Sequence, residues 1–218
     1  MMSRAARIVA FCVFGVAAPG IAATAAWADM IDTSGMAPWE TCAECHNMNG
    51  ISHMAKFPKL AGQRYAYLVK QIGDFQVERR TNDGGRMVTN AGLLSSDEVA
   101  AVAKYFSTLP PPPPVTADAD AETIGLGRRL FTEGKPEAGV AACASCHAGA
   151  GVAGVLAPRI EAQHADYLKK ELIDFRGGAR SNDPDERMRK IARALSDAEI
   201  VAVATYASTL ERPQGAAP

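Results

Sequence analysis

The sequence predicts an all-α protein built from two tandem domains. Apolar residues recur at helical spacing, and no stretch alternates apolar and polar residues as a half-buried strand would. Most of the chain also repeats itself with an offset of about one hundred residues. That offset is far longer than a solenoid repeat, so each copy is expected to be a domain of its own.

The two copies match at many positions. The equivalent segments are 58–63 with 158–163, 67–68 with 167–168, 74–75 with 174–175, 80–83 with 180–183, 94–95 with 195–196, and 105–109 with 206–210. Each copy therefore predicts the structure of the other.

Helices are predicted in both copies from spacing and capping. Tyr65, Leu68, Ile72 and Phe75 lie on one helical face, and the second copy repeats most of that face. The last helix of each copy opens with a capping box, Ser-x-x-Glu, at residues 95–98 and 196–199. A helix has room to form ahead of the second copy at 124–131. In the first copy Trp39 is the main anchor and the opening helix is expected to be short or distorted.

The chemistry of the chain is indicated by a motif that occurs twice. Cys42, Cys45 and His46 form Cys-x-x-Cys-His, and Cys143, Cys146 and His147 form it again. Two thiols at this spacing can add to the two vinyl groups of a porphyrin, and the following histidine then ligates the iron. The sequence therefore predicts two covalently attached haem c groups.

The cysteines have three alternative uses. Two Cys-x-x-Cys pairs can form a zinc site, a thioredoxin-like dithiol, or disulfides in an oxidising compartment. None of these uses explains a histidine directly after the second cysteine in both copies.

The ends and the linker set the expected boundaries. Arg4, Arg7, an apolar run and the sequence Ala-Trp-Ala at 26–28 are typical of a cleaved signal peptide, residues 1–28. The alternative, an uncleaved anchor, has an apolar run that is short for a bilayer span. The first domain is expected at 29–109 and the second at 120–212, with a flexible tail at 213–218. Between the domains, 110–119 begins with five prolines and is expected to be a stiff polyproline II spacer rather than a floppy linker.

The net charge of the chain restricts the kinds of partner that it is expected to bind. The formal net charge is −1, and loss of Arg4 and Arg7 with the leader makes it more negative. A nucleic-acid partner would require a basic excess, so none is expected. Cys12 leaves with the leader, so all the remaining cysteines lie in the two motifs.

The sixth iron ligand is predicted to be a methionine in each copy. Met87 and Met188 each lie seven residues before the matched Leu94 and Leu195, and both fall in polar segments without an apolar stripe. His53 and His164 do not occupy equivalent positions, so bis-histidine ligation of one haem is the weaker alternative. Methionine ligation closes the iron to substrates and leaves electron transfer.

Other matched residues are candidates for supporting roles. A backbone carbonyl at Pro58 or Pro158 could accept the proximal histidine Nδ1–H. Arg80 and Arg180, with Asn82 and Asn182, could donate to haem propionates, although ordinary loop contacts explain them equally well.

Together these motifs resemble cytochrome c4, a family of periplasmic dihaem proteins. The resemblance rests on Cys-x-x-Cys-His, Pro-Lys-Leu-Ala-Gly-Gln, Tyr-Leu, Asp-Phe, Arg-x-Asn, a methionine and Leu-Ser-x-x-Glu, and it spans the chain after the leader. It implies two class I cytochrome c domains, each wrapped around one haem. It also implies His46 with Met87 on one iron and His147 with Met188 on the other.

The same resemblance implies function and location. It predicts an electron carrier rather than an enzyme, exported to the periplasm and loosely associated with the inner membrane. Expected partners are a terminal oxidase, a quinol-oxidising complex or a dehydrogenase. The alternative is a dihaem subunit of a larger oxidoreductase, such as a flavocytochrome sulfide dehydrogenase. An enzyme acting at an open haem, such as a peroxidase, would need a vacant ligand position, against which the matched methionines argue.

Overall fold

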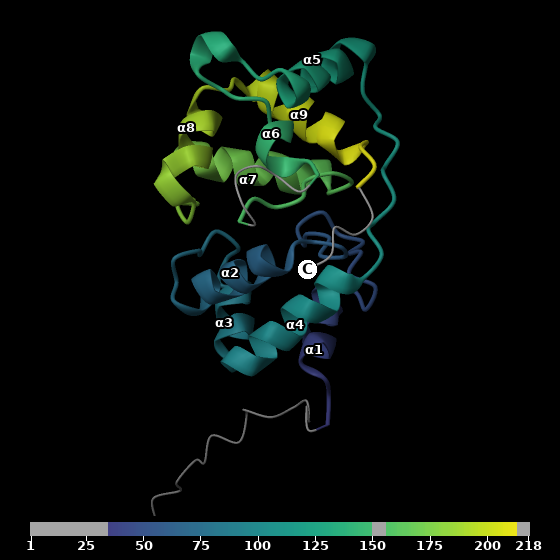
Figure 1. The fold of residues 1–218 in the computed structure, drawn as a ribbon, viewed down its shortest axis with the longest axis vertical. Helices are drawn as coiled ribbons and strands as arrows, with labels where there is room; N and C mark the ends of the chain where they lie inside the picture. Colours follow the sequence, from purple (N-terminus) through teal and green to yellow (C-terminus); the bar gives the residue numbers. More distant parts are fainter. Residues whose placement is uncertain (1–34, 150–155, 213–218) are drawn as a thin grey trace, which may run out of the picture. The chain divides into compact units, whose positions relative to one another are not determined.

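The structure is a computed structural model that describes residues 35–149 and 156–212 (Figure 1). The predicted leader, 1–28, and the predicted tail, 213–218, lie outside the described residues. Within them the elements are helical apart from one isolated bridge between Lys135 and Val140, which confirms the all-α prediction. None of the described helices combines the length and the apolar character needed to cross a bilayer.

The first half packs its helices around one apolar core. Its described α-helices are α1 (Pro38–His46), α2 (Tyr65–Gln76), α3 (Arg86–Gly92) and α4 (Ser96–Thr108). Helix α2 contacts both α3 and α4, while α1 packs on α4. The apolar face predicted for α2 supplies Leu68, Ile72 and Phe75 to this core, where they meet Val102 and Phe106 of α4.

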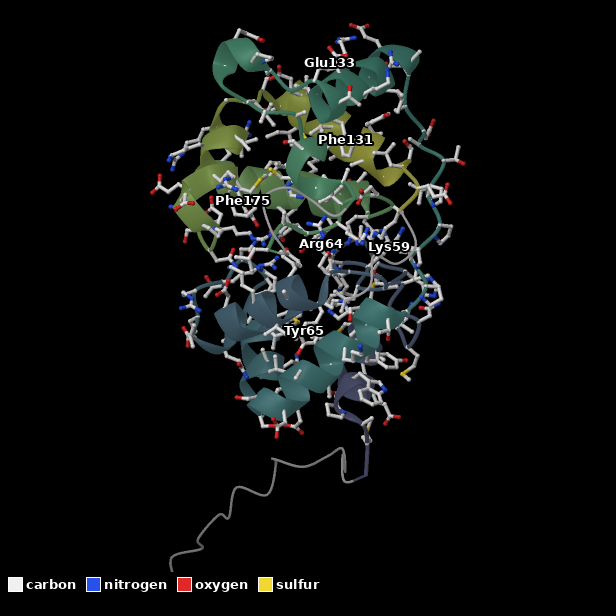
Figure 2. The ribbon with its side chains drawn as sticks, in the orientation of Figure 1. Lys59, Arg64, Tyr65, Phe131, Glu133 and Phe175 are labelled. Atoms are coloured by element: carbon white, nitrogen blue, oxygen red, sulfur yellow. The ribbon has the colours of Figure 1, made fainter. Side chains whose placement is uncertain are left out.

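The second half repeats this plan with an additional opening helix. Its elements are α5 (Ala121–Thr132), η1 (Pro136–Ala138), α6 (Ala144–His147), α7 (Ala165–Gly177), η2 (Pro184–Glu186), α8 (Arg187–Arg193) and α9 (Asp197–Ser208). Helix α5 packs along α9, and α7 contacts both α8 and α9 (Figure 1). The core contains Leu130 and Phe131 of α5 with Ile200 and Val203 of α9. Figure 2 labels Phe131 on α5 and Phe175 on α7.

Both predicted capping boxes are present. The Ser95 hydroxyl accepts from Glu98 N at 3.3 Å, and the Glu98 carboxylate accepts from Ser95 N at 2.8 Å. In the second half, Ser196 and Glu199 make the same pair of bonds at 3.3 and 2.7 Å. These bonds satisfy backbone donors that the first helical turn leaves unpaired, which is why α4 and α9 begin where they do.

The opening segments differ as expected. In the first half the motif lies on α1 itself, and Trp39 of that helix stacks on Tyr105 of α4 with ring centroids 4.8 Å apart. In the second half a separate helix, α5, precedes the motif helix, and its Phe131 meets Tyr206 edge-on at 5.7 Å. The helix expected at 124–131 is therefore confirmed.

The linker is attached to both halves. Residues 110–120 form neither helix nor strand. Gly62 has a φ of +65°, and a Cβ there would lie 3.3 Å from Pro111, so the glycine lets the linker approach the first half closely. Further along, Val115 N donates to Ser208 O at 3.1 Å. The predicted domain boundaries and the stiffness of the linker stay predictions.

Candidate functional site

The structure contains a cavity of about 1090 Å³ that extends through both halves. Its walls include apolar core residues of each half, such as Leu68 and Phe75 in the first and Leu168 and Phe175 in the second. The predicted attachment and axial residues of both halves line this one cavity: Cys42, Cys45, His46, Met87, Cys143, Cys146, His147 and Met188. The repeat therefore places two equivalent sets of side chains in a shared enclosure.

Each Cys-x-x-Cys-His motif forms a helical turn. Cys42 and Cys45 lie three residues apart on α1, so their side chains lie on one face, and His46 ends the helix. The second motif has the same form, with Cys146 and His147 on α6. The four motif cysteines are partly buried, and no disulfide joins them. Burial raises the pKa of the Cys42 thiol and raises that of Cys143 to about 11.

The described residues do not assemble a metal site from the four cysteines. Nowhere in the described ranges do three His, Cys, Asp or Glu side chains converge as a protein-bound metal ion would require.

The two motif histidines are buried and oriented in the same way. The Nδ1 atom of His46 lies 2.9 Å from Pro58 O, and that of His147 lies 2.8 Å from Pro158 O. A carbonyl can only accept, so Nδ1 carries the proton and Nε2 keeps its lone pair. Burial lowers the pKa of both imidazoles, although the backbone bond acts the other way. A buried neutral imidazole with a fixed tautomer is suited to ligating a metal.

The two matched methionines lie on short helices at the cavity wall. Met87 is in the first turn of α3, where its N–H donates to the Asp83 carboxylate, and Met188 is in the first turn of α8. Met48 and Met54 behave differently, because each is about half exposed, at 48% and 49%. The backbone anchor at Asp83 orients the helix that presents Met87 to the cavity.

Neither histidine outside the motifs is among the residues that line the cavity in the described part of the chain. His164 Nε2 instead lies 2.9 Å from the Ser52 hydroxyl of the other half. It occupies the position equivalent to Arg64, whose guanidinium also crosses to the other half and donates to Gly149 O at 2.8 Å. Figure 2 labels Arg64 beside Lys59, where the halves meet.

Two glutamines join the halves by reciprocal backbone bonds. The side-chain amide of Gln63 accepts from Arg159 N at 2.8 Å and donates to Arg159 O at 2.9 Å. Gln163 makes the same two bonds to Lys59, both at 2.9 Å. Because equivalent residues exchange equivalent bonds, this part of the interface has an approximate two-fold symmetry.

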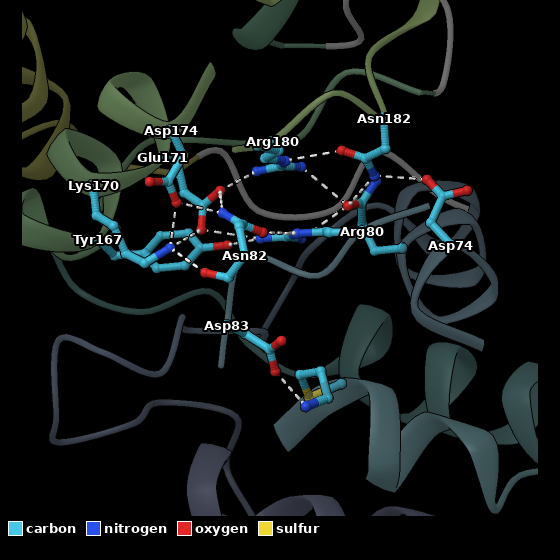
Figure 3. A network of polar contacts seen from close by, with 12 residues as sticks. Asp74, Arg80, Asn82, Asp83, Tyr167, Lys170, Glu171, Asp174, Arg180 and Asn182 are labelled. Carbon is cyan, nitrogen blue, oxygen red and sulfur yellow. Dashed lines mark hydrogen bonds and ion pairs between the residues drawn. The ribbon is translucent and has the colours of Figure 1, made fainter. Parts of the chain in front are cut away.

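A larger polar cluster continues this symmetry (Figure 3). We call it the interhalf cluster; it consists of Tyr67, Gln71, Asp74, Arg80 and Asn82 with Tyr167, Glu171, Asp174, Arg180 and Asn182. Arg80 donates to Tyr167 OH at 3.0 Å, and Arg180 donates to Tyr67 OH at 3.2 Å. The arginines and asparagines predicted to meet propionates thus line the cavity while also bonding across the interface.

The cavity fits a porphyrin that bears carboxylates. Its walls are largely apolar, and thiols and neutral imidazoles open onto it from both halves. Arg159 also lines the cavity, and its buried Nη1 has no hydrogen-bond partner among the described residues. An unpaired buried guanidinium nitrogen is costly, and a propionate carboxylate would supply the missing acceptor.

Comparison with known proteins identifies the class. A family model described as cytochrome c matches residues 34–110 and 126–211, so each half is a c-type cytochrome domain. Cytochrome c4 of Thiocapsa roseopersicina is 44% identical over 174 residues, which are 78% of this chain and 88% of that protein. The chain belongs to the cytochrome c4 family.

Further similarities agree with this assignment. The crystal structure of reduced recombinant cytochrome c4 from Pseudomonas stutzeri superposes with a TM-score of 0.71 at 34% identity, covering 79% of this chain and 95% of that one. A thiosulfate dehydrogenase electron acceptor from Stutzerimonas stutzeri is 37% identical over 167 residues, covering 76% of each chain. The chain is thus a dihaem electron carrier with two covalently attached haem c groups, and it is not an enzyme.

The residues of the interface between the halves were not predicted from the sequence. Gln63, Gln163, Tyr67 and Tyr167 stood out only as matches between the copies. The only indication in the sequence was that these polar side chains recur at equivalent positions in both copies although no chemical role explains them. It did not reveal that the partner of each residue is backbone or side chain in the other half.

Proposed function

We propose that this chain carries electrons between redox proteins of the periplasm through two haems, one ligated by His46 and Met87 and the other by His147 and Met188. The observation that carries the proposal is the single cavity lined by both ligand sets. When bound, haem supplies reversible one-electron chemistry at iron.

The residues of the chain have distinct roles in this proposal. Cys42, Cys45, Cys143 and Cys146 tether the two porphyrins. Pro58 O and Pro158 O fix the ring orientation of the histidines, at 2.9 and 2.8 Å from Nδ1. The methionines close the sixth position, which keeps substrates from the iron and raises the reduction potential relative to a second histidine.

The location and partners follow from the leader and the relatives. The sequence at 26–28 supports cleavage of a signal peptide and release of the mature chain into the periplasm, where it can associate peripherally with the inner membrane. The mature domains are then 29–109 and 120–212. Partners of the respiratory chain are a quinol-oxidising complex as donor and a terminal oxidase as acceptor.

A second candidate is supported by the relatives named as thiosulfate dehydrogenase electron acceptors, from Stutzerimonas stutzeri and Thiomonas intermedia. In that case a periplasmic dehydrogenase is the electron donor, and the chain acts as its acceptor or dedicated subunit. Native size fractionation with a haem stain separates the two candidates, because only a subunit co-migrates with a larger enzyme.

The ligand assignment is tested by Met87→His and Met188→His in the holoprotein. Each substitution is expected to remove one haem's share of the near-infrared band of ferric Met-ligated haem and to lower one of the two reduction potentials. The control is Met54→His, which alters a half-exposed methionine and is expected to leave both unchanged. An unaltered band in Met87→His or Met188→His would refute that ligand.

A further inference from the structure

The interhalf cluster contains one position at which the two halves differ in charge. Arg80 matches Arg180, Asn82 matches Asn182, Asp74 matches Asp174 and Tyr67 matches Tyr167, all with an offset of one hundred residues. At the remaining matched position the first half has Gln71 and the second has Glu171. An amide and a carboxylate of the same shape therefore occupy equivalent places among the matched members of the cluster. Beside the cluster, Arg79 donates to Asp74 at 3.0 Å, and the second half has Ala179 at that position.

The two side chains make equivalent contacts. Gln71 Oε1 accepts from Arg80 Nη1 at 2.8 Å, from Arg180 Nη2 at 3.0 Å and from Asn182 Nδ2 at 3.0 Å. Glu171 accepts from Arg180 Nη1 at 2.7 Å, from Arg80 Nη2 at 3.1 Å and from Asn82 Nδ2 at 3.0 Å. At 71 a single amide oxygen accepts the three bonds that the two carboxylate oxygens share at 171, so an uncharged side chain can serve these donors.

The carboxylate of Glu171 is ionised over the whole physiological pH range. Burial alone would raise its pKa, but the charges of Arg80, Arg180 and Lys170 outweigh burial and hold the pKa at about 2. Its side chain is only 8% exposed, so solvent screens its field weakly. At this matched position the second half therefore carries a buried negative charge, and the first half carries a neutral amide.

This charge is anchored to the second half. Glu171 lies on α7 next to Leu172, which packs on the second core together with Leu168. Gln71 lies on α2 between Leu68 and Ile72 of the first core. Both polar side chains line the shared cavity, and each accepts from Arg80 and from Arg180, so it is the helix of each residue, not its hydrogen bonds, that places it in its own half.

We propose that the carboxylate of Glu171 makes the two haem sites electrostatically unequal and lowers the reduction potential of the second haem more than that of the first. A nearby negative charge stabilises the oxidised iron, which carries one more positive charge than the reduced iron, and the effect weakens with distance. Nearby charge and burial are recognised levers on haem potential. This inference rests on the proposed assignment of one haem to each half.

The test removes the charge, adds a second one, and moves the original one to the other half. Glu171→Gln removes it, Gln71→Glu adds one to the first half, and the double variant Gln71→Glu with Glu171→Gln transfers it from α7 to α2. The measured quantities are the two potentials, by spectroelectrochemical titration of the holoprotein, and the thermal midpoint. Met87→His and Met188→His assign each potential to its half.

The expected results are directional. Glu171→Gln should raise both potentials, the second by more, and Gln71→Glu should lower chiefly the first. The double variant should have its first potential lowered and its second raised relative to the unsubstituted protein. The matched control is Glu186→Gln, which removes a charge from the same half at a side chain that is 51% exposed, and it should have a much smaller effect.

The inference is overturned if the double variant keeps both original potentials, or if Glu171→Gln shifts both by the same amount. The exchange preserves composition and total charge, so a general loss of structure would appear in the thermal midpoint rather than as opposite shifts. Failure of the underlying assignment would look different, because Met87→His and Met188→His would then not each move one potential.

Discussion

In both halves an aromatic ring packs on a tyrosine of the last helix, but the ring comes from a different place in the chain. Both last helices, α4 and α9, carry a matched tyrosine that needs an aromatic partner. In the first half that partner is Trp39, from the motif helix itself, and in the second it is Phe131, from a helix that precedes the motif. The packing requirement is thus shared, while the segment that meets it is not.

This difference shows what a repeat in sequence can and cannot specify. The aromatic residue that packs on each tyrosine has no equivalent in the other copy. Trp39 lies three residues before Cys42, whereas Phe131 lies twelve residues before Cys143. Apolar contact is non-directional, so different backbone routes can bring a ring to the same place. Three experiments test how far the two halves are equivalent.

The largest expected loss of stability comes from removing the aromatic side chain that packs on the tyrosine of each half. Phe131 is 5% exposed, so Phe131→Ala should lower the free energy of unfolding by roughly 3–5 kcal/mol. Trp39 is only half-buried, and Trp39→Ala should lie at or below the lower end of that range. Denaturant unfolding of the two holoprotein variants measures the difference. A larger loss for Trp39→Ala would mean that the first half depends more on its single ring.

The next effect concerns the charge that distinguishes the cluster. The pKa of Glu171 is about 2 in the fold against an ordinary value of 4.5, so its ionisation contributes roughly 3 kcal/mol of stability at neutral pH. Because the folded pKa is the lower one, this stability is complete above about pH 4.5 and is lost as the pH falls through 2. Glu171→Gln should therefore be less stable than the unsubstituted protein at pH 7, with the gap closing in acid. A gap of constant size between pH 7 and pH 2 would contradict this account.

The smallest effects distinguish two glycines of α5, the helix that the first half lacks among its described elements. A Cβ at Gly127 would overlap the Ala202 carbonyl and lie 2.7 Å from the Tyr206 Cβ, so Gly127→Ala should destabilise by about 1–3 kcal/mol. A Cβ at Gly125 would have as its nearest neighbour Arg129 Nη1, at 3.8 Å, so Gly125→Ala should stabilise by about 0.5–1 kcal/mol. Thermal melting of this pair shows whether α5 needs its close approach to α9. Equal midpoints would rule out that requirement.

Much of the local structure could be predicted from the sequence. The apolar face of α2, the capping boxes of α4 and α9 and the helix at α5 depend on neighbours within a few residues, which the sequence displays directly. The two haem motifs are equally local. The equivalence of Met87 and Met188 was visible only because the chain repeats, and both do line the cavity.

The interface between the halves could not be predicted in the same way. Arg80 and Arg180 carried the right charge for propionates, yet each is also bonded to Gln71 and Glu171, with one of those bonds crossing to the other half. Such contacts join residues about one hundred positions apart, and no local pattern records which pairs will meet. The buried Arg212, whose guanidinium donates to Ala61 O at 2.6 Å, is a further contact of this kind.

The reciprocal bonds of Gln63 and Gln163 have a consequence for how such a chain can diversify. An interface in which residue i meets residue j and j meets i is the kind that two identical subunits form around a two-fold axis. In a homodimer every substitution appears on both sides, so an amide at one position and a carboxylate at its mate cannot coexist. Joining two such subunits into one polypeptide removes that restriction, and the pair Gln71 and Glu171 is a difference that a fused protein can encode and a homodimer cannot.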